Sequence, residues 1–200
     1  MLFDDDWKVD EYFGKPTVVI MVSGGAQDFE MMPRVERVFR EGLVRAARIT
    51  NAWVFTGGSA SGVMKHVGDA LAPHPDIPCL GMPLYGNVVG NAQIDGKLRA
   101  LPPRAPGERP GELFADELDV VDYVYSEELN SKESAALEPH HTHFVLVDTK
   151  QAGPTAWGGE IAFGLQTQLA YCELESLPAV MLVVHGGPNT LKSVVAAVRK

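Results

Sequence analysis

Three apolar segments of strand length each run into a pair of glycines, and a helical pattern follows two of these pairs closely. The segments are residues 17–22, 52–55 and 179–184, and the pairs are Gly24-Gly25, Gly57-Gly58 and Gly186-Gly187. Continuous apolar runs rich in β-branched residues are typical of strands buried on both faces of a parallel sheet. Such strands, alternating with helices, form βαβ units. The pattern therefore predicts an α/β domain with a Rossmann-like, doubly wound parallel sheet.

The remaining elements continue this alternation. Apolar residues at three- and four-residue spacing predict a helix over 33–49 that begins at Pro33. Further helices are expected at 62–71, 160–172 and 190–199, and further strands at 77–82 and 142–148. Residues 87–140 are rich in Pro, Gly and acidic residues, with only a weak helix or strand signal at 117–125. We expect them to form a long irregular insertion or lid.

Length and charge limit the class of protein. The 200 residues suit one domain, with residues 1–16 as an acidic amino-terminal arm and residues 17–200 as the domain itself. A hydrophobic content of 46% and a charged content of 22% exclude a mainly disordered chain. The net charge of −9 disfavours nucleic acid as a partner, because phosphate backbones are bound by clustered positive charge.

Targeting and redox signals point to the cytoplasm. No apolar run approaches the roughly 20 residues of a membrane-spanning helix. The first residues carry several Asp and no apolar signal-peptide core. Cys79 and Cys172 lie far apart and outside any CxxC pair, so neither a disulfide scaffold nor a cysteine zinc site is expected. We expect a cytoplasmic protein whose own residues make no membrane contact.

The glycine junctions predict where a ligand binds. The carboxyl ends of parallel strands meet at one edge of the sheet, which is where open α/β domains bind ligands. Glycine lets the backbone approach a ligand closely, and the N–H groups that begin a helix attract anions. A single junction can serve only its own turn. Three of them at one edge favour a phosphate-bearing ligand.

Familiar catalytic fingerprints do not fit. Residues 57–65 (GGSASGVMK) have the glycine spacing of a P-loop, but Val63 stands at the lysine position. No GxGxxG sequence occurs, which argues against an ordinary dinucleotide site. Ala60 stands where a nucleophile elbow has serine. We therefore assign no catalytic residue and no cofactor.

A histidine cluster at 140–143 (HHTH) raises the question of a metal site. His141 and His143 would share one face of a strand, but no nearby Cys or paired carboxylate completes a ligand set, and Asp148 lies at the far end. A structural or solvent-facing role is favoured, and no metal is assigned. Glu160 follows two glycines and is interpreted either as a first-turn carboxylate that offsets the helix dipole or as a catalytic group.

Five segments carry a family resemblance: 16–25 (PTVVIMVSGG), 37–47 (RVFREGLVRAA), 52–71 (AWVFTGGSASGVMKHVGDAL), 141–148 (HTHFVLVD) and 183–190 (VVHGGPNT). They resemble the amino-terminal cytosolic region of melastatin-type transient receptor potential (TRPM) cation channels. That region is a SLOG domain, a Rossmann-like fold shared with the DprA and LOG nucleotide-handling proteins. The resemblance spans nearly the whole chain outside residues 87–140. It implies a ligand-sensing domain for nucleotide-derived molecules, with ADP-ribose the best-known ligand in some members.

The junctions and the resemblance together predict the ligand-binding residues. The cradle comprises Gly24, Gly25, Thr56, Gly57, Gly58, Ser59, Ser61, Gly62, Val63, Gly186, Gly187, Pro188, Asn189 and Thr190. Outside it we add Tyr85, Gly86, Trp157, Gly158 and Glu160. Trp157 matches an aromatic residue that helps hold ADP-ribose in binding relatives, whereas Gly164 stands near the position of their arginine.

The resemblance also weakens an enzymatic interpretation. LOG enzymes carry PGGxGTxxE, in which the Glu helps to cleave an N-glycosidic bond. Aligned on the third glycine pair, this chain has His185, Asn189 and Ser193 in place of the Pro, the last Gly and the Glu. A binding module is therefore the leading hypothesis. A LOG-like hydrolase that uses Glu160 or Asp148, and an assembly domain with a decayed pocket, stay open.

Partners follow from the same resemblance. Relatives usually continue past the final helix, so the resemblance implies either a piece of a larger channel-like protein, truncated at both ends, or a free-standing SLOG protein. The expected partners are a nucleotide-derived small molecule and further copies of the chain in a homo-oligomer.

Overall fold

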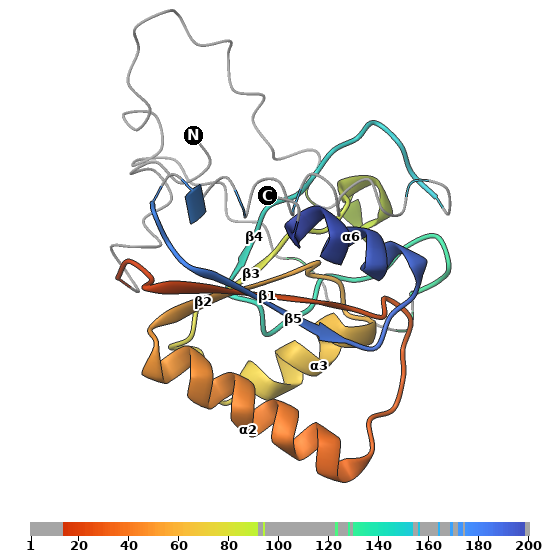
Figure 1. The fold of residues 1–200 in the computed structure, drawn as a ribbon. Coiled ribbons are helices and arrows are strands. Elements are labelled where there is room, and N and C mark those ends of the chain that lie inside the picture. The colour runs from red at the N-terminus through yellow and green to blue at the C-terminus, as the bar shows by residue number, and fades with distance from the viewer. Residues whose placement is uncertain are drawn as a thin grey trace, which may run out of the picture.

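A parallel sheet forms the centre of the molecule (Figure 1). The computed structural model describes residues 14–91, 94, 123, 128, 130–153, 156, 164, 169, 172, 173 and 175–198. The strands are β1 (Val18–Gly24), β2 (Ala52–Thr56), β3 (Cys79–Gly81), β4 (His143–Phe144) and β5 (Ala179–Val184). All neighbours pair in parallel, in the order β4-β3-β2-β1-β5. The predicted α/β fold is confirmed.

The central strands are apolar on both faces because both faces are covered. On β1, Val19 and Met21 belong to one buried cluster, whereas Ile20 and Val22 belong to the other. The same alternation continues on β2, where Trp53 lies in the first cluster. Side chains of successive strand residues point to opposite faces, so an uninterrupted apolar run marks a strand with a core on each side.

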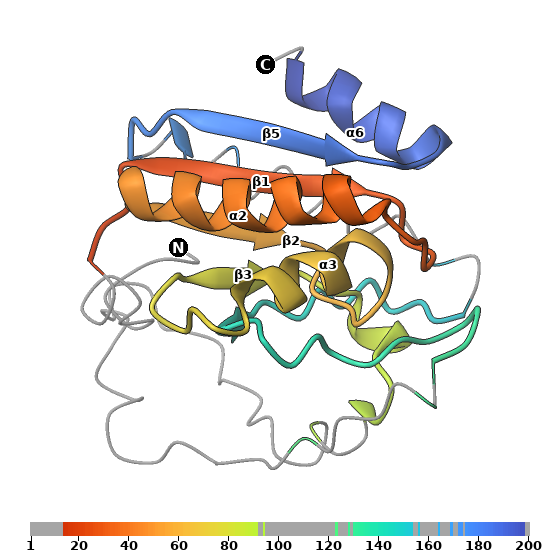
Figure 2. The ribbon, with the colours of Figure 1, turned by 90° about the horizontal axis from the view of Figure 1, so that it is seen from below.

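The helices lie on both sides of the sheet. Helices α2 (Pro33–Ile49) and α3 (Gly62–Leu71) cover one face, and α6 (Pro188–Val198) covers the other (Figures 1 and 2). Both α2 and α6 begin with a proline, which has no N–H to leave unsatisfied in a first turn. Within the described residues, no helix combines the length and the apolar character needed to cross a membrane.

Helix α2 buries less than its sequence pattern predicts. Leu43 and Ala47 are buried, and Phe39 packs against the core. Val35 and Val38 share the same periodicity but are exposed. The apolar stripe therefore meets the protein only over the second half of the helix.

Two strands are shorter than expected. The predicted strand 142–148 is regular only over the two residues of β4, and the predicted strand 77–82 only over β3. Val147 still donates a backbone hydrogen bond to the carbonyl of Pro83 over 2.9 Å. The Tyr85 amide returns a hydrogen bond to the Val147 carbonyl over 2.9 Å, so Leu84 and Val147 form an isolated parallel bridge. Pro83 has no N–H to donate to the Val145 carbonyl, so the regular ladder is interrupted there.

Both described ends of the predicted insertion pack on the body of the domain. Val88 bridges to Ala135, and Leu137 bridges to Ser59 in the loop before α3. The short 3-10 helix η1 (Tyr85–Asn87) introduces this region. Of the weak 117–125 signal, only Tyr123 lies within the described residues, and its hydroxyl donates to the Val89 carbonyl over 2.7 Å. Of the predicted helix 160–172, only Gly164, Leu169 and Cys172 lie within the described residues, and most of the acidic arm lies outside them.

Candidate functional site

The glycine junctions after β1, β2 and β5 meet at one edge of the sheet. These three strands are neighbours and run in parallel, so their carboxyl ends coincide. The amide of Gly25 donates to the carbonyl of Val184 over 3.3 Å, and the amide of Val63 donates to the carbonyl of Gly25 over 2.8 Å. The Thr190 hydroxyl donates to the carbonyl of Gly24 over 3.0 Å. The expected convergence of the three junctions is present.

The centre of this edge is a topological switch point. From β1 the chain passes through α2 to β2 on one side, while β5 lies on the other side of β1 and leads to α6 on the opposite face. Diverging connections at such a point leave a crevice beyond the strand ends, which is where open parallel sheets bind ligands.

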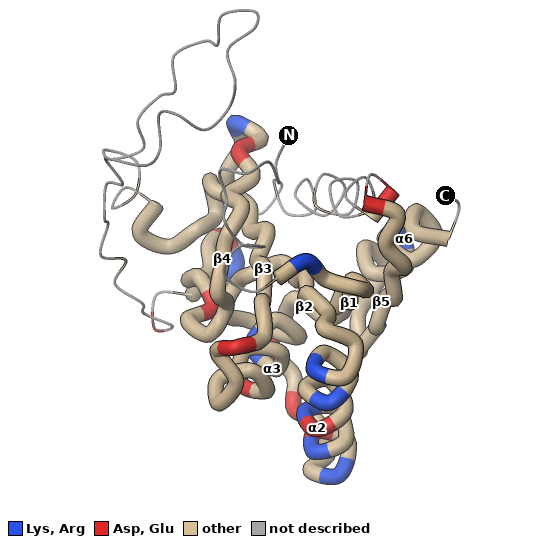
Figure 3. Tube along the Cα trace, turned by 90° about the vertical axis from the view of Figure 1, so that its left-hand side faces the viewer, with Lys and Arg blue, Asp and Glu red and all other residues tan. Residues whose placement is uncertain are grey.

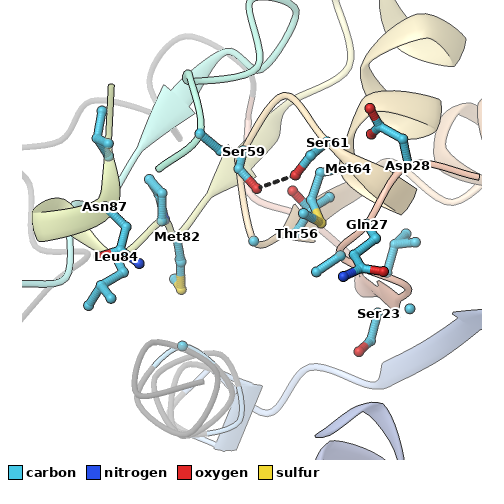
Figure 4. Close-up of a pocket in the computed structure, with 18 of the residues that line it drawn as sticks. Ser23, Gln27, Asp28, Thr56, Ser59, Ser61, Met64, Met82, Leu84 and Asn87 are labelled. Atoms are coloured by element: carbon cyan, nitrogen blue, oxygen red, sulfur yellow. Dashed lines mark hydrogen bonds between the residues drawn. The ribbon is translucent and has the colours of Figure 1, made fainter. Parts of the chain in front are cut away.

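A cavity of about 640 Å³ lies at this edge (Figure 4). Its described lining comes from β1 and the loop after it, the β2–α3 loop, the segment after β3, residues 130–135, β5 and α6. The lining residues are Met21, Val22, Ser23, Gly24, Ala26, Gln27, Asp28, Thr56, Gly57, Ser59, Ser61, Met64, Met82, Pro83, Leu84, Asn87, Val88, Asn130, Ser131, Lys132, Ala135, Gly164, Met181 and Ser193.

The predicted cradle is only partly cavity wall. Gly24, Thr56, Gly57, Ser59 and Ser61 line the cavity. The described residues that lie outside its lining are Gly25, Gly58, Gly62, Val63, Tyr85, Gly86, Gly186, Gly187, Pro188, Asn189 and Thr190. Trp157, Gly158 and Glu160 lie outside the described residues.

The first amides of α3 are already bonded within the chain. The Gly62 amide donates to Asp28 Oδ1 over 2.8 Å, and the next amide, of Val63, donates to the Gly25 carbonyl. Ser61, the residue before the helix, makes no capping hydrogen bond with its side chain. The loop after β1 therefore supplies the cap, and a phosphate could use these amides only by displacing it.

The β5–α6 junction is open to solvent. Residues 185–189 are all exposed, whereas Thr190 is buried and joins α6 to the end of β1. The His185 ring stacks on Phe29 with ring centroids 4.6 Å apart. This junction closes the edge of the sheet beside the cavity without lining it.

The histidine cluster forms a buried hydrogen-bond chain. Glu138, 2% exposed, lies 2.6 Å from Nδ1 of His141 and 3.0 Å from Nδ1 of His140. A carboxylate only accepts, so both Nδ1 atoms donate to it. His141 Nε2 and the Thr56 hydroxyl oxygen share a hydrogen bond of 2.6 Å, and the same hydroxyl oxygen accepts from the Gly58 amide over 2.9 Å. The structural role expected for this cluster fits these contacts.

Neither a metal site nor a reactive thiol is found among the described residues. They contain no group of three or more His, Cys, Asp or Glu side chains placed to hold a metal ion. Burial raises the pKa of the Cys79 thiol well above its usual value, and the nearby Glu138 charge raises it further. Burial also raises the pKa of Cys172. Both thiols are therefore poor nucleophiles near neutral pH.

Ser193, which the resemblance to LOG enzymes aligns with their glutamate, lines the cavity. Its side chain is buried, and its hydroxyl donates to the Asn189 carbonyl one turn earlier over 3.2 Å. A serine hydroxyl cannot act as a carboxylate base. The geometry thus places the altered residue at the cavity wall.

Sequence reasoning missed much of the wall. Ser23, Gln27 and Asp28 directly flank or follow the first glycine pair, so their proximity to that pair was the available signal. Met21 and Met181 are register partners on neighbouring strands and line the cavity together. Lys132 and its neighbours come from the region interpreted as a lid, where no periodicity predicted their position.

The fold and this cavity define an open parallel α/β domain with a ligand crevice at its switch point. A family model described as SLOG in TRPM matches residues 1–105, and its prokaryotic counterpart matches residues 118–200. The chain belongs to this family of SLOG domains.

Three similar proteins are named as cation channels. The chain is 34% identical over 196 residues to transient receptor potential cation channel subfamily M member-like 2 of Nematostella vectensis, covering 92% of the chain and 12% of the relative. It is 33% identical over 199 residues to subfamily M member 1 of Mus musculus, covering 94% and 11%. It is 32% identical over 201 residues to subfamily M member 6 of Homo sapiens, covering 94% and 9%. The chain thus spans about a tenth of the length of these relatives.

Proposed function

We propose that this domain binds a nucleotide-derived, phosphate-bearing small molecule of the ADP-ribose kind in the cavity at the carboxyl edge of the sheet. The observation that carries the proposal is a cavity of about 640 Å³ at the switch point beside β1. Its volume lies within the range of about 300–1,000 Å³ that is usual for small-molecule sites. Its wall mixes thioether and aliphatic groups with hydroxyls and amides, which suits a ligand with an apolar ring and polar substituents.

Binding would serve regulation. The relatives are named as cation channels, so the domain would act in the cytosolic part of a TRPM-like channel that assembles as an oligomer. A ligand shifts such a protein between states only if it binds one state more tightly than the other. Closure of the cavity around a ligand would couple the loop after β1 to residues 130–135, which also contribute to the lining.

The charge of the cavity sets the expected affinity. Among the described lining residues, Lys132 is the cation and Asp28 is the anion. The arginines of α2, clearly grouped in Figure 3, are absent from the lining (Arg34, Arg37, Arg40, Arg45 and Arg48). One lysine in a domain of net charge −9 supports an affinity on the order of micromolar or weaker.

A hydrolase is the less favoured function. The wall holds a serine at the position of the LOG glutamate, and Asp28 is engaged at the start of α3. Asp148 pairs with the side chain of Lys150 and is absent from the described lining. Release of free base from AMP on incubation with the protein would favour the hydrolase instead.

The test is titration calorimetry of the chain with ADP-ribose, AMP and ribose 5-phosphate. Lys132→Gln removes the lining cation, and Lys192→Gln removes an exposed cation on α6 that does not line the cavity. We expect Lys132→Gln to weaken ADP-ribose binding by about five-fold, or about 1 kcal/mol, and Lys192→Gln to leave it unchanged.

Two outcomes would contradict the proposal. The reverse pattern would place the ligand at the exposed β5–α6 junction rather than in the cavity. Failure of every phosphate-bearing nucleotide to bind at millimolar concentration would favour the assembly domain.

A further inference from the structure

The cavity carries a carboxylate at a place where a phosphate site would have free amides. Asp28 Oδ1 accepts the Gly62 amide over 2.8 Å, and the Val63 amide is used by the Gly25 carbonyl. The negative charge of Asp28 therefore already lies at the positive end of the α3 dipole. A phosphate brought to this end of the cavity would meet a like charge at close range.

The two ends of the cavity differ in chemistry. Figure 4 shows Ser23, Gln27 and Asp28 together on one side, and Met82 with Leu84 on the other. The first side thus gathers polar side chains, one of them a carboxylate. The second side presents a thioether and a branched alkyl chain.

The side chain of Asn87, on the second side, is already hydrogen-bonded to the backbone of Gly153. Its amide nitrogen donates to the Gly153 carbonyl over 3.1 Å, and its amide oxygen accepts the Gly153 N–H over 2.9 Å. A side chain whose two polar atoms are already hydrogen-bonded within the protein contributes little to the recognition of a ligand. The apolar end therefore selects by shape and polarizability, which suits a flat ring against methionine sulfur.

The second carboxylate oxygen of Asp28, Oδ2, determines which ligand groups can bind at the polar end of the cavity. Within the described part of the chain, Oδ1 has one donor and no donor is bonded to Oδ2. A carboxylate offers only acceptor sites, so its ligand must supply hydrogen-bond donors. Neighbouring hydroxyls of a sugar are such donors, and two of them fit one carboxylate.

We propose that Asp28 is the specificity residue of this cavity: it turns phosphate away from α3 and accepts hydrogen bonds from the ribose hydroxyls of a ribonucleotide, whose base lies toward Met82 and Leu84. The inference rests on the proposed function and deepens it, because it makes the ligand a ribonucleotide rather than a deoxyribonucleotide or a bare phosphate. The phosphate then lies away from the α3 terminus.

The experiment is calorimetry with AMP, 2′-deoxy-AMP, 3′-deoxy-AMP and inorganic pyrophosphate. The proteins are the unaltered chain, Asp28→Asn and Glu30→Gln. Asparagine keeps an oxygen that can accept the Gly62 amide, so the cap of α3 survives while the charge is lost. Glu30 is an exposed carboxylate two residues away that does not line the cavity, so its variant is the matched charge control.

We expect the unaltered chain to bind AMP about ten-fold more tightly than at least one of the deoxy forms, since a hydrogen bond to a charged group is at stake. In Asp28→Asn the preference falls to about two-fold, and in Glu30→Gln it persists. Pyrophosphate binds Asp28→Asn about three-fold more tightly than the unaltered chain or Glu30→Gln, because the like charge beside the α3 terminus is gone. The comparison of ligands on the unaltered chain tests hydroxyl recognition even if Asp28→Asn does not fold.

Equal affinity of the unaltered chain for AMP and both deoxy forms overturns the inference and leaves the proposed function standing. Unchanged pyrophosphate affinity in Asp28→Asn also overturns it, because Asp28 would then not turn phosphate away from α3. Failure of every nucleotide to bind overturns the proposed function and this inference together.

Discussion

The β2–α3 and β5–α6 junctions share a Gly-Gly signature but differ in burial. In the first, Gly58, Ser59, Ala60 and Gly62 are buried, and α3 continues with a largely buried face. In the second, residues 185–189 are exposed, and α6 buries only Thr190 and Ser193 among its described residues. One junction lies under packed neighbours, and the other lies beside solvent.

The glycines at the two junctions consequently differ in how closely other chain segments approach them. A Cβ on Gly62 would overlap the Gly25 carbonyl oxygen, and the residue has a positive φ of 53°. A Cβ on Gly187 would meet nothing within 4 Å, and its φ is not in the left-handed region. Within the Gly-Gly pairs themselves, a Cβ on Gly58 would overlap the Gly81 backbone, and a Cβ on Gly186 would overlap the Thr190 side chain. Both glycines have a positive φ, of 77° and 123°, so each pair holds one glycine that its own packing requires. A glycine pair after a strand is by itself a sign of packing as much as of ligand binding.

The largest expected effect separates these two junctions directly. Gly62→Ala should lower the free energy of unfolding by about 3 kcal/mol or more, because it adds both overlap and strain at a positive φ. Gly187→Ala, the matched control, should change it by less than about 0.5 kcal/mol. Urea unfolding followed by circular dichroism measures both. Equal losses in the two variants would erase the distinction between the junctions.

The second-largest expected effect concerns the hydrogen bonds of Glu138, which support the buried β2–α3 junction through His141 and Thr56. Glu138→Gln should cost about 2 kcal/mol, because its carboxylate accepts from Nδ1 of His141 and from both Nδ1 and the amide of His140. A glutamine turns an NH₂ group toward at least one of these donors. Glu133→Gln, at an exposed carboxylate on the same segment, is the control and should be nearly neutral. A loss below about 0.5 kcal/mol for Glu138→Gln would mean that this chain does not hold the junction.

The sequence predicted the fold well where one physical cause dominates. The runs that became β1, β2 and β5 are apolar because both sheet faces are buried, and that cause leaves an unmistakable local pattern. The strand at 142–148 was predicted too long because its regularity depends on Pro83 across the ladder, which lies far away in sequence. The exposure of Val35 and Val38 likewise depends on which neighbours pack on α2, which helix periodicity does not encode.

The candidate site was harder to predict than the fold. Glycine junctions indicated the edge at which the cavity lies, and Thr56, Ser59 and Ser61 line that cavity. The role of Asp28 was not predicted because its hydrogen bond with the Gly62 amide, at the start of α3, joins two loops that a helix and a strand separate in the sequence. Residues 130–135 escaped because only tertiary contacts, such as Asn130 Nδ2 to the Ala60 carbonyl over 2.9 Å, bring them to the site.

A smaller effect tests the exposed junction itself. Thr190→Val should lower the free energy of unfolding by about 1 kcal/mol, because the Thr190 hydroxyl bonds the Gly24 carbonyl and valine has the same shape without the donor. Ser193→Ala serves as the control, since its hydroxyl bonds a carbonyl of its own helix. Thermal unfolding of the two variants measures the difference. Identical midpoints would show that Thr190 does not tie α6 to β1.

The smallest effect is expected on the outer face of α6. Leu191, Val195 and Val198 recur on one side of the helix and are exposed, with Leu191 at 67%. Leu191→Gln should therefore change the free energy of unfolding by less than about 0.5 kcal/mol, as should Val38→Gln on the exposed part of α2. The measurement is thermal unfolding over a hundred-fold range of protein concentration. A loss above about 1 kcal/mol for Leu191→Gln alone, with a midpoint that rises with concentration only in the unaltered chain, would contradict this expectation. That result would mean that a second copy covers α6 in solution, because association adds stability by mass action, and the exposed junction would then be a contact surface.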